Sequence, residues 1–236
     1  MSAIVASGLQ KTYGSGDDQV EAVRGVDLDV SAGEVFGFLG PNGAGKSTTV
    51  RMLTTLMTLS AGSARVGGVD VAADPHGARR KIGVALQEAG LDARQTGREL
   101  LSLQARLFGM SKHESATRAS ELLELVELED AGDRRVKGYS GGMKRRLDLA
   151  SALVHRPEVL FLDEPTTGLD PASRLTVWDE VRRINQLGTT VFLTTQYLEE
   201  ADQLCDRLAI IDAGRIVRSG TPAALKDDLR DRHGLA

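Results

Sequence analysis

The stretch Gly40–Thr48 reads Gly-Pro-Asn-Gly-Ala-Gly-Lys-Ser-Thr, which fits the pattern Gly-x-x-x-x-Gly-Lys-Ser/Thr of a phosphate-binding loop. Residues Val35–Leu39 before it are apolar and predict a buried strand, and Lys46–Leu56 after it carries apolar residues at helical spacing. A strand, a glycine-rich turn and a helix in this order form the arrangement that the pattern requires. The sequence therefore predicts that a nucleoside triphosphate binds at this turn.

Each part of this loop has a physical role in holding phosphate. The glycines let backbone N–H groups turn inward toward an anion, and the N-terminus of the following helix adds partial positive charge. We expect Lys46 to reach the β and γ phosphates and the Ser47 hydroxyl to ligate Mg²⁺, with Thr48 nearby. A nucleoside triphosphate with Mg²⁺ is therefore the expected ligand.

A second apolar run, Val159–Leu162, ends in the two carboxylates Asp163 and Glu164. Asp163 at the carboxyl end of a strand can hold Mg²⁺, directly or through water, and Glu164 can polarise an attacking water. The alternative is a solvated turn after a buried strand. A phosphate-binding loop in the same chain favours the catalytic interpretation.

A third feature, Ser140-Gly141-Gly142-Met143, opens a predicted helix whose inner face carries Met143, Leu147, Ala150 and Leu153. Ser140 is a good N-cap, and the two glycines expose the first backbone N–H groups, which makes a second anion-binding helix start. The alternative is an ordinary well-capped helix. Two such starts in one chain suggest that one ATP molecule is held by two surfaces, which two protomers can supply.

The bulk composition limits the possible functions. The chain has 236 residues and a formal net charge of −4, which gives no electrostatic reason to expect nucleic-acid binding. The single cysteine, Cys205, excludes an internal disulfide and suits a reducing cytosol. No run of apolar residues is long enough to cross a membrane, so a transport role would need other subunits. Arginine outnumbers lysine, which is typical of a bacterial genome of high GC content.

The remaining elements follow from periodicity and from turn and cap residues. Helical patterns replace strand patterns from about residue 90 to 135, with a capping box at Ser111–Glu114. One helix there should bury Ala116, Ala119, Leu122, Leu123 and Val126, and another, with Asp170 as N-cap and Pro171 next, should bury Leu175, Trp178, Val181 and Ile184. A last short helix should follow Thr221. The predicted strands are Ala3–Ala6, Val26–Val30, Gly62–Val66, Lys81–Leu86, Glu158–Leu162, Thr190–Thr194, Arg207–Ile211 and Arg215–Ser219.

From Tyr13 to about Gly220 the chain resembles the ATP-binding subunit of ABC transporters. Tyr139–Met143 lies at the position of the family's Leu-Ser-Gly-Gly-Gln signature. By resemblance, Tyr13 stacks on adenine, and Gln87 touches Mg²⁺ and links the helical lobe to the membrane subunit. Thr167–Asp170 resembles the loop that runs along the dimer interface.

The chain departs from the family pattern at two places. The signature begins with Tyr139 and ends with Met143, and Gln196 stands where the family has its switch histidine. A glutamine amide can donate a hydrogen bond to the γ-phosphate but cannot carry positive charge. Both departures resemble the daunorubicin/doxorubicin-resistance subgroup of exporters.

The resemblance implies an α/β fold of the ABC ATPase type. This architecture combines a P-loop NTPase core, built on a mixed sheet with helices, with an antiparallel β subdomain and a helical subdomain. One ATP-binding domain would span residues 1–225, with the helical subdomain at about 90–155 inserted in the core. Residues 226–236 would form a charged C-terminal tail.

The function implied by the resemblance is ATP hydrolysis that drives an exporter of drugs, antibiotics or other hydrophobic compounds. Two copies, as a homodimer, would close head to tail around two ATP molecules. A separate transmembrane permease would hold them at the cytoplasmic face of the membrane, and no nucleic acid is expected. Three alternatives stay open: an importer subunit, a non-transport ABC ATPase acting on nucleic acid or ribosomes, and a regulatory module that scarcely hydrolyses.

Carried onto this sequence, the resemblance assigns each site residue a role. Catalysis is assigned to Lys46, Glu164 and Gln196, and the Mg²⁺ ion to Ser47, Gln87 and Asp163. Contacts to the nucleotide are assigned to Tyr13, Gly40, Pro41, Asn42, Gly43, Ala44, Gly45, Lys46, Ser47, Thr48, Gln87, Ser140, Gly141, Gly142 and Asp170.

Overall fold

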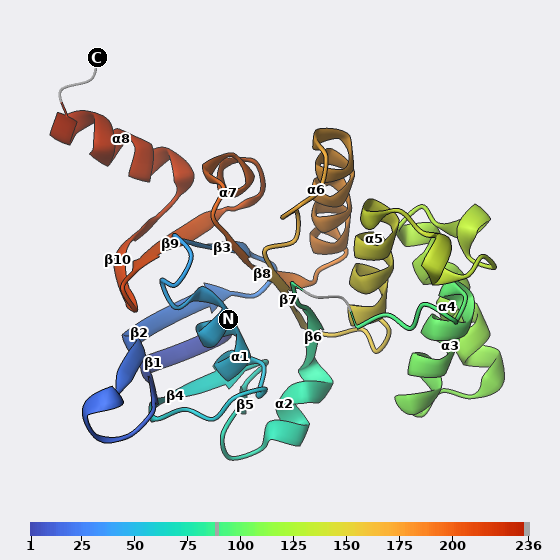
Figure 1. The fold of residues 1–236 in the computed structure, drawn as a ribbon, viewed down its shortest axis with the longest axis horizontal. Coiled ribbons are helices and arrows are strands. Elements are labelled where there is room, and N and C mark those ends of the chain that lie inside the picture. The colour runs from blue at the N-terminus through green and yellow to red at the C-terminus, as the bar shows by residue number, and fades with distance from the viewer. Residues whose placement is uncertain (88–89, 234–236) are drawn as a thin grey trace.

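The computed structural model describes residues 1–87 and 90–233, which form two sheets with helices packed around them (Figure 1). In the described chain the larger sheet has the strand order β10-β9-β3-β8-β7-β6. The pairings from β6 to β9 are parallel and β10 is antiparallel to β9, so the predicted mixed α/β core is confirmed. These strands are β3 (Val35–Leu39), β6 (Ile82–Ala85), β7 (Val159–Asp163), β8 (Thr190–Thr195), β9 (Arg207–Asp212) and β10 (Arg215–Gly220).

The smaller sheet is antiparallel and lies on one side of the larger one (Figure 1). Its order is β2-β1-β4-β5, from β1 (Ser2–Tyr13), β2 (Val20–Ser31), β4 (Ala61–Val66) and β5 (Val69–Asp70). Helix α1 (Lys46–Leu53) packs between the sheets, because its buried Val50 and Met52 belong to the same apolar cluster as Ile4 of β1 and Phe38 of β3. The helix that follows the glycine-rich loop is therefore held from two sides.

The central strands of the larger sheet are covered on both faces. Successive residues of a strand point to opposite faces. Phe161 and Phe192 pack toward α1 and the smaller sheet, whereas their neighbours Leu162 and Leu193 pack toward helices on the other face. Burial on both faces explains why these strands read as nearly unbroken apolar runs.

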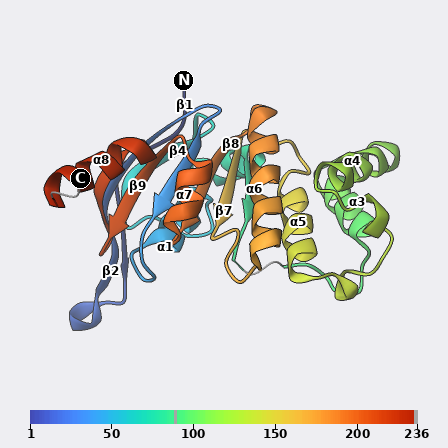
Figure 2. The same ribbon diagram turned by 90° about the horizontal axis from the view of Figure 1, so that it is seen from above.

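Most of the helices lie on the face of the larger sheet away from the smaller one. In Figure 2, α3 and α4 form the end of the molecule farthest from α8, and α5 and α6 lie between them and the strands. Their bounds are α3 (Gly97–Leu107), α4 (Lys112–Leu125), α5 (Gly141–Ala152), α6 (Pro171–Gln186), α7 (Leu198–Leu204) and α8 (Pro222–His233). Short 3₁₀ turns occur at Gly16–Asp18, Glu129–Ala131 and Val136–Gly138.

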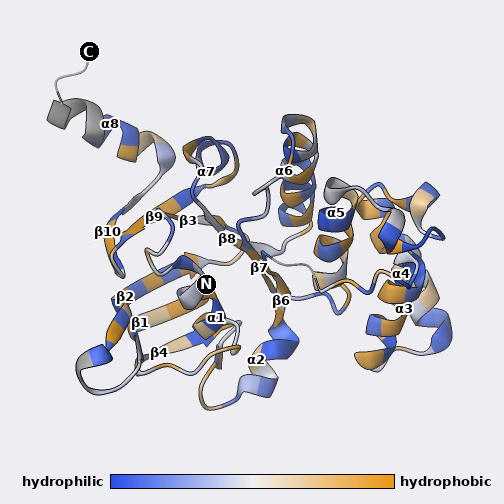
Figure 3. Ribbon diagram, viewed as in Figure 1, coloured by the Kyte–Doolittle hydropathy of each residue, from blue (hydrophilic) through white to orange (hydrophobic). Residues whose placement is uncertain are grey.

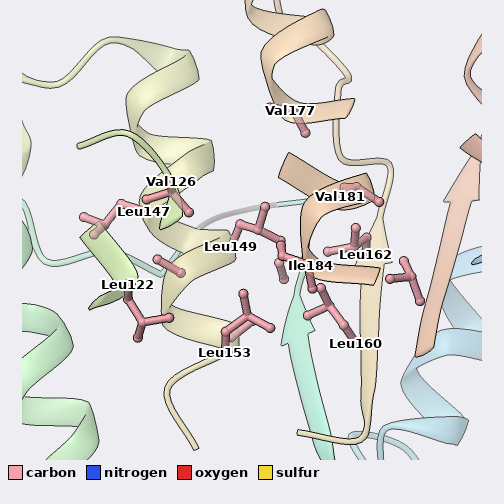
Figure 4. Packing of buried hydrophobic residues seen from close by; sticks show 14 of the residues in the cluster. Leu122, Val126, Leu147, Leu149, Leu153, Leu160, Leu162, Val177, Val181 and Ile184 are labelled. Atoms are coloured by element: carbon pink, nitrogen blue, oxygen red, sulfur yellow. The ribbon is translucent and has the colours of Figure 1, made fainter. Parts of the chain in front are cut away.

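Helix α5 joins the helical lobe to the sheet. Figure 4 shows Leu147 directed toward Leu122 of α4, and Leu149 directed toward Leu160 of β7 and Ile184 of α6. All five belong to one buried apolar cluster. The predicted helical subdomain therefore shares its core with the strand that ends in Asp163.

The cap residues predicted for α4, α5 and α6 are confirmed. Ser140 caps α5 by accepting from the Met143 N–H. Ser111 caps α4 in a reciprocal capping box with Glu114, and Asp170 caps α6, with Pro171 as its first residue. Each capped start satisfies backbone N–H groups that the helix itself leaves unpaired.

Two predictions of buried side chains are wrong. Leu175 is 56% exposed: residues spaced by three drift by about 60° per step around a helix, so Leu175 lies on the side of α6 opposite Ile184. Ala116 is exposed, and its neighbour Ser115 is buried instead. Ser115 tolerates burial because its hydroxyl donates to the Lys112 carbonyl at 3.0 Å.

The other differences concern element bounds. Helix α1 ends at Leu53, before the predicted Leu56, and Thr55 has a φ of 62° that no α-helix continues. Lys81 ends α2 (Pro75–Lys81), a helix that the sequence reading missed. Figure 3 shows why: α2 is largely hydrophilic, with no apolar stripe, whereas the adjoining β6 is hydrophobic.

At the carboxyl end, α8 runs from Pro222 to His233 and crosses the predicted boundary between residues 225 and 226. Lys226 donates to Asp202 of α7 at 2.5 Å. Residues 234–236 of the predicted tail lie outside the described residues, and the division into domain and tail stays a prediction.

Candidate active site

The predicted phosphate-binding, metal-binding and catalytic residues lie at one edge of the larger sheet. Strands β3, β8, β7 and β6 are adjacent and parallel, so their carboxyl ends meet at that edge. A pocket of about 360 Å³ opens there, and Gln87, Glu164 and Gln196 line it from the ends of β6, β7 and β8. The loop after β3 and the first turn of α1 supply further lining residues to the same pocket: Asn42, Gly43, Gly45, Lys46, Ser47 and Thr48.

The glycine-rich loop has the backbone that the pattern requires. Gly45 has a φ of 105°, and a Cβ there would lie 2.5 Å from the Ala22 carbonyl oxygen, so no other residue fits. Helix α1 begins at the next residue without a side chain capping its N-terminus. Its first N–H groups and its dipole therefore face the pocket that Lys46 and Ser47 line.

Lys46 is buried, and its ammonium group has three close partners. Its Nζ donates to the Gly40 and Pro41 carbonyls at 2.8 and 3.0 Å. It also lies 3.2 Å from Oε1 of Glu164, and the two side chains are only 4% and 8% exposed. Lys46 thus joins the glycine-rich loop to the carboxylate that the sequence singled out as the base.

Asp163 lies beside Ser47, as expected if both side chains bind the same metal ion. Oδ1 of Asp163 accepts from the Ser47 hydroxyl at 3.2 Å and from the Thr194 hydroxyl at 2.6 Å. Within residues 1–87 and 90–233, no three His, Cys, Asp or Glu side chains gather into a metal site. One carboxylate and one hydroxyl nevertheless fit Mg²⁺, which takes few protein ligands and completes its shell with water and phosphate oxygens.

Glu164 is placed by a strained backbone. Its φ is 49°, in the left-handed region that a residue with a side chain seldom adopts. Its N–H donates to the carbonyl and the hydroxyl of Thr194 at 3.1 and 3.0 Å, and its Oε2 accepts from Thr167 at 3.3 Å. The conformation turns the carboxylate into the pocket.

Several predicted nucleotide contacts lie outside the described lining of this pocket. Tyr13, at the end of β1, donates its hydroxyl to Sδ of Met57 at 3.0 Å. Asp170 accepts from the first N–H groups of α6, and Ala44 is buried behind the loop. Ser140, Gly141 and Gly142 start α5, where Ser140 is exposed and its hydroxyl accepts from the Met143 N–H. The two anion-binding helix starts of one chain therefore do not share a described pocket.

Sequence reasoning missed three residues that shape the site. Ala22 lines the pocket from β2, and Thr194 holds both Asp163 and Glu164 from β8. Arg145 of α5 donates to the Asp163 carbonyl. Thr194 ends the predicted strand Thr190–Thr194, and Ala22 lies before the predicted strand Val26–Val30, so neither residue carries a chemical signal in the sequence. Only Arg145, a charged residue in a helix predicted to pack inward, offered one.

The sequence profile described as "ABC transporter" matches residues 23–167, more than half of the chain. The chain belongs to the ABC transporter family. It is accordingly an ATP-binding and ATP-hydrolysing subunit, as the sequence predicted.

Relatives of this ABC subunit confirm the subgroup resemblance. It is 55% identical over 227 residues to the daunorubicin/doxorubicin resistance ATP-binding protein DrrA of Streptomyces peucetius, across 96% of this chain and 68% of the relative. A doxorubicin resistance ATP-binding protein of Mycobacterium tuberculosis is 51% identical, across 95% of this chain and 67% of the relative. The Nod factor export ATP-binding protein I of Rhizobium etli is 46% identical, with shares of 97% and 71%.

Solved structures confirm the fold. The ATP-binding cassette MJ0796, a dimer in a post-hydrolysis state with ADP and Pi, superposes with a TM-score of 0.83 at 26% identity, over 93% of this chain and 98% of the other. The ATP-binding subunit of another ABC transporter gives 0.83 at 29% identity, over 99% and 94%.

Proposed function

We propose that this ABC subunit powers the export of drugs or other hydrophobic compounds, as one half of an ATP-bound dimer attached to a separate transmembrane permease. The observation that carries the assembly is the exposed start of α5, which lies apart from the pocket of its own chain. Relatives named for drug resistance and for export support the direction of transport. Import and non-transport roles remain the alternatives that an experiment must exclude.

Binding of the triphosphate would begin with Lys46. Its ammonium group pairs with Glu164 at 3.2 Å, and a triphosphate carries more negative charge than one carboxylate. We expect Lys46 to turn to the β and γ phosphates. Glu164 would then be free to accept a proton from the attacking water.

The side chains beside Lys46 would hold a metal ion with the nucleotide. Ser47 and Asp163, joined by a hydrogen bond of 3.2 Å, would be the protein ligands of Mg²⁺, with Gln87 at the pocket wall. The ion would neutralise phosphate charge. Asp163 is held in place by Thr194, which also holds the backbone of Glu164, so the metal ligand and the base are positioned by one residue.

Closure of the dimer would complete the pocket. Ser140, Gly141 and Gly142 of one chain would present backbone N–H groups to the γ-phosphate bound by the partner chain. Neither surface alone satisfies the phosphate charge, so the nucleotide favours closure and hydrolysis reverses it. Asp170, at the start of α6, would lie along this interface, and Tyr13 would stack on the adenine.

Attachment to a membrane would come from the permease. Within the described residues, no helix combines the length and apolar character needed to cross a bilayer. We place the chain at the cytoplasmic face of the cell membrane, where ATP is available and the permease can hold it.

The test is transport by inverted membrane vesicles that contain this chain and the membrane protein encoded beside it. We expect daunorubicin, used as a fluorescent probe, to accumulate inside the vesicles when ATP is added. The Lys46→Ala variant should abolish accumulation and lower ATP hydrolysis at least about 100-fold. Accumulation only in right-side-out vesicles that were loaded with ATP would establish import, and hydrolysis that moves no amphipathic probe would exclude drug export.

A further inference from the structure

Helix α5 carries a buried arginine for which the family motifs give no role. The Arg145 side chain is only 10% exposed. Its Nε donates to the Pro165 carbonyl at 2.9 Å and its Nη2 to the Asp163 carbonyl at 3.3 Å. These two carbonyls belong to the residues directly before and after Glu164.

The third nitrogen of the same side chain reaches another part of the site. Nη1 of Arg145 donates to the Leu86 carbonyl at 2.6 Å, one residue before Gln87. It also pairs with Oδ2 of Asp148 at 3.1 Å, one helical turn further along α5. Burial raises the pKa of Asp148 to about 6, although Arg145 opposes that shift. A buried pair of this kind costs much to break, because either partner alone would be an uncompensated charge.

We propose that Arg145 is a positioning residue for hydrolysis, which holds the backbone on both sides of Glu164 and the backbone before Gln87. The inference rests on the proposed role of Glu164 as the base. A residue at a φ of 49° keeps that conformation only where its surroundings impose it. Thr194 holds the Glu164 N–H from the sheet side, and Arg145 holds the flanking carbonyls from the helix side.

The chemistry of the side chain suits this task. A guanidinium presents donors in a rigid planar fork, so one side chain can serve carbonyls of separate segments. A lysine ammonium is a single nitrogen and cannot reach the carbonyls of Leu86, Asp163 and Pro165 in the same way. Arginine is therefore required here for its shape as well as for its charge.

Arg118 of α4 offers a matched control, because it binds the backbone carbonyls that follow the C-terminal end of α5. The Arg118 side chain is 16% exposed, donates to the Leu153 and Val154 carbonyls at 2.7 and 3.1 Å, and pairs with Glu121 at 3.0 Å. Its partners resemble those of Arg145 in kind, with two backbone carbonyls and one carboxylate where Arg145 has three carbonyls and one carboxylate. None of them adjoins Glu164, so loss of Arg118 should affect stability alone.

The experiment compares ATP hydrolysis by the purified full chain with that of Arg145→Gln and Arg118→Gln, each rate divided by the folded fraction. We expect Arg145→Gln to lower kcat between about 10- and 100-fold and to leave the KM for ATP within about twofold, because the phosphate-binding loop is untouched. Arg118→Gln should lower Tm by a similar amount and leave kcat unchanged. Equal losses of kcat in both variants, or a raised KM with unchanged kcat, would overturn the proposal.

Two further variants keep the test decisive. Arg145→Lys retains charge and bulk, and should still show the loss of kcat even if Arg145→Gln does not fold; full activity in the lysine variant would refute the need for the fork. In a Glu164→Gln background, Arg145→Gln should change the residual rate by less than about twofold, because the two act through one step. If Glu164→Gln itself retains turnover, the proposed base is wrong; if only the arginine variants retain it, the positioning role alone is wrong.

Discussion

Glu164 is the residue on which the proposed chemistry depends. Its carboxylate lies 3.2 Å from the Lys46 ammonium group, and both side chains are buried. A neutral amide of the same size at this position can still accept hydrogen bonds but cannot take a proton from water. Replacing Glu164 with glutamine should therefore slow the chemical step without weakening the binding of ATP.

We predict that Glu164→Gln lowers kcat for ATP hydrolysis at least about 100-fold, the usual contribution of a general base, and retains ATP binding. The trapped nucleotide should shift the chain from monomer to dimer, as measured by size-exclusion chromatography with light scattering. Glu158→Gln is the control, since Glu158 is exposed and pairs with Lys81 away from the pocket. A variant that stays monomeric with ATP would count against the shared pocket.

Gln196 permits a second prediction at this scale. It is half-buried at the pocket wall, where the family has a histidine. Its amide can donate a hydrogen bond to the γ-phosphate without a charge. We predict that Gln196→His leaves kcat at pH 7.5 unchanged or modestly higher, measured by phosphate release. A complete loss of turnover would show that Gln196 has another role.

The site residues that the sequence revealed are those that follow strand ends in recognisable runs. The chemistry of the glycine-rich loop and of the Asp163–Glu164 pair can each be recognised from a few consecutive residues. Thr194 and Arg145 could not be assigned, because their roles arise only when β8 and α5 pack against β7. The assigned roles of Tyr13 and Asp170 rest on resemblance and stay predictions.

At the scale of elements, the contact between α5 and α6 contains a buried acid. Glu180 of α6 is 1% exposed, and neither carboxylate oxygen has a hydrogen-bond partner in the described chain. Nε of Arg146 approaches to 3.9 Å. Burial raises the pKa of Glu180 to about 8, more than Arg146 lowers it.

The folded chain thus binds this proton more tightly than the unfolded chain, whose glutamate titrates near 4.5. The contribution of Glu180 to stability is therefore greatest at low pH and declines as pH rises from 4.5 toward 8. We predict that Glu180→Gln removes this decline and raises Tm above pH 8 by about 2–4 °C for each kcal/mol recovered. Melting curves from pH 5 to 9 test this, with Asp179→Asn, an exposed neighbour, as control. Parallel curves for Glu180→Gln and the unchanged chain would contradict it.

Strands and helices could be predicted where burial alone determined the pattern of apolar residues. The strands β7 and β8 were found because burial on both faces leaves them almost wholly apolar. Helix α2 was missed because no apolar stripe marks it, although Asp74-Pro75 has the form of an N-cap followed by proline, and Asp74 accepts from the Gly77 N–H at 2.7 Å. Leu175 was wrongly predicted to be buried because residues spaced by three stay on one face of a helix for only about one turn. After three such steps, from Ile184 back to Leu175, the side chain lies on the opposite face.

At the scale of the whole molecule, the question is whether each ATP pocket needs two chains. The Gly141→Asp variant tests this without disturbing the fold. A Cβ at this position would lie no closer than 3.9 Å to Leu169, and an acidic residue is favourable at a helix start. The added charge should repel the phosphates of the partner's nucleotide. Lys46→Ala should disable the pocket of its own chain.

We predict that a mixture of these two inactive variants recovers about a quarter of the normal hydrolysis rate. Half of the dimers formed at random are mixed, and each mixed dimer has one intact pocket of two. The measurement is phosphate release after the chains are combined in equal amounts. A mixture as inactive as its components would mean that each chain works alone.

The neutral Gln196 has a consequence for the cell that contains this protein. An imidazole gains a proton as the pH falls past its ordinary pKa near 6.5, so a protein that relies on one changes its turnover with pH. An amide has no such response. We therefore expect the turnover of this ABC subunit to lack the pH dependence near 6.5 that a histidine at this position would add.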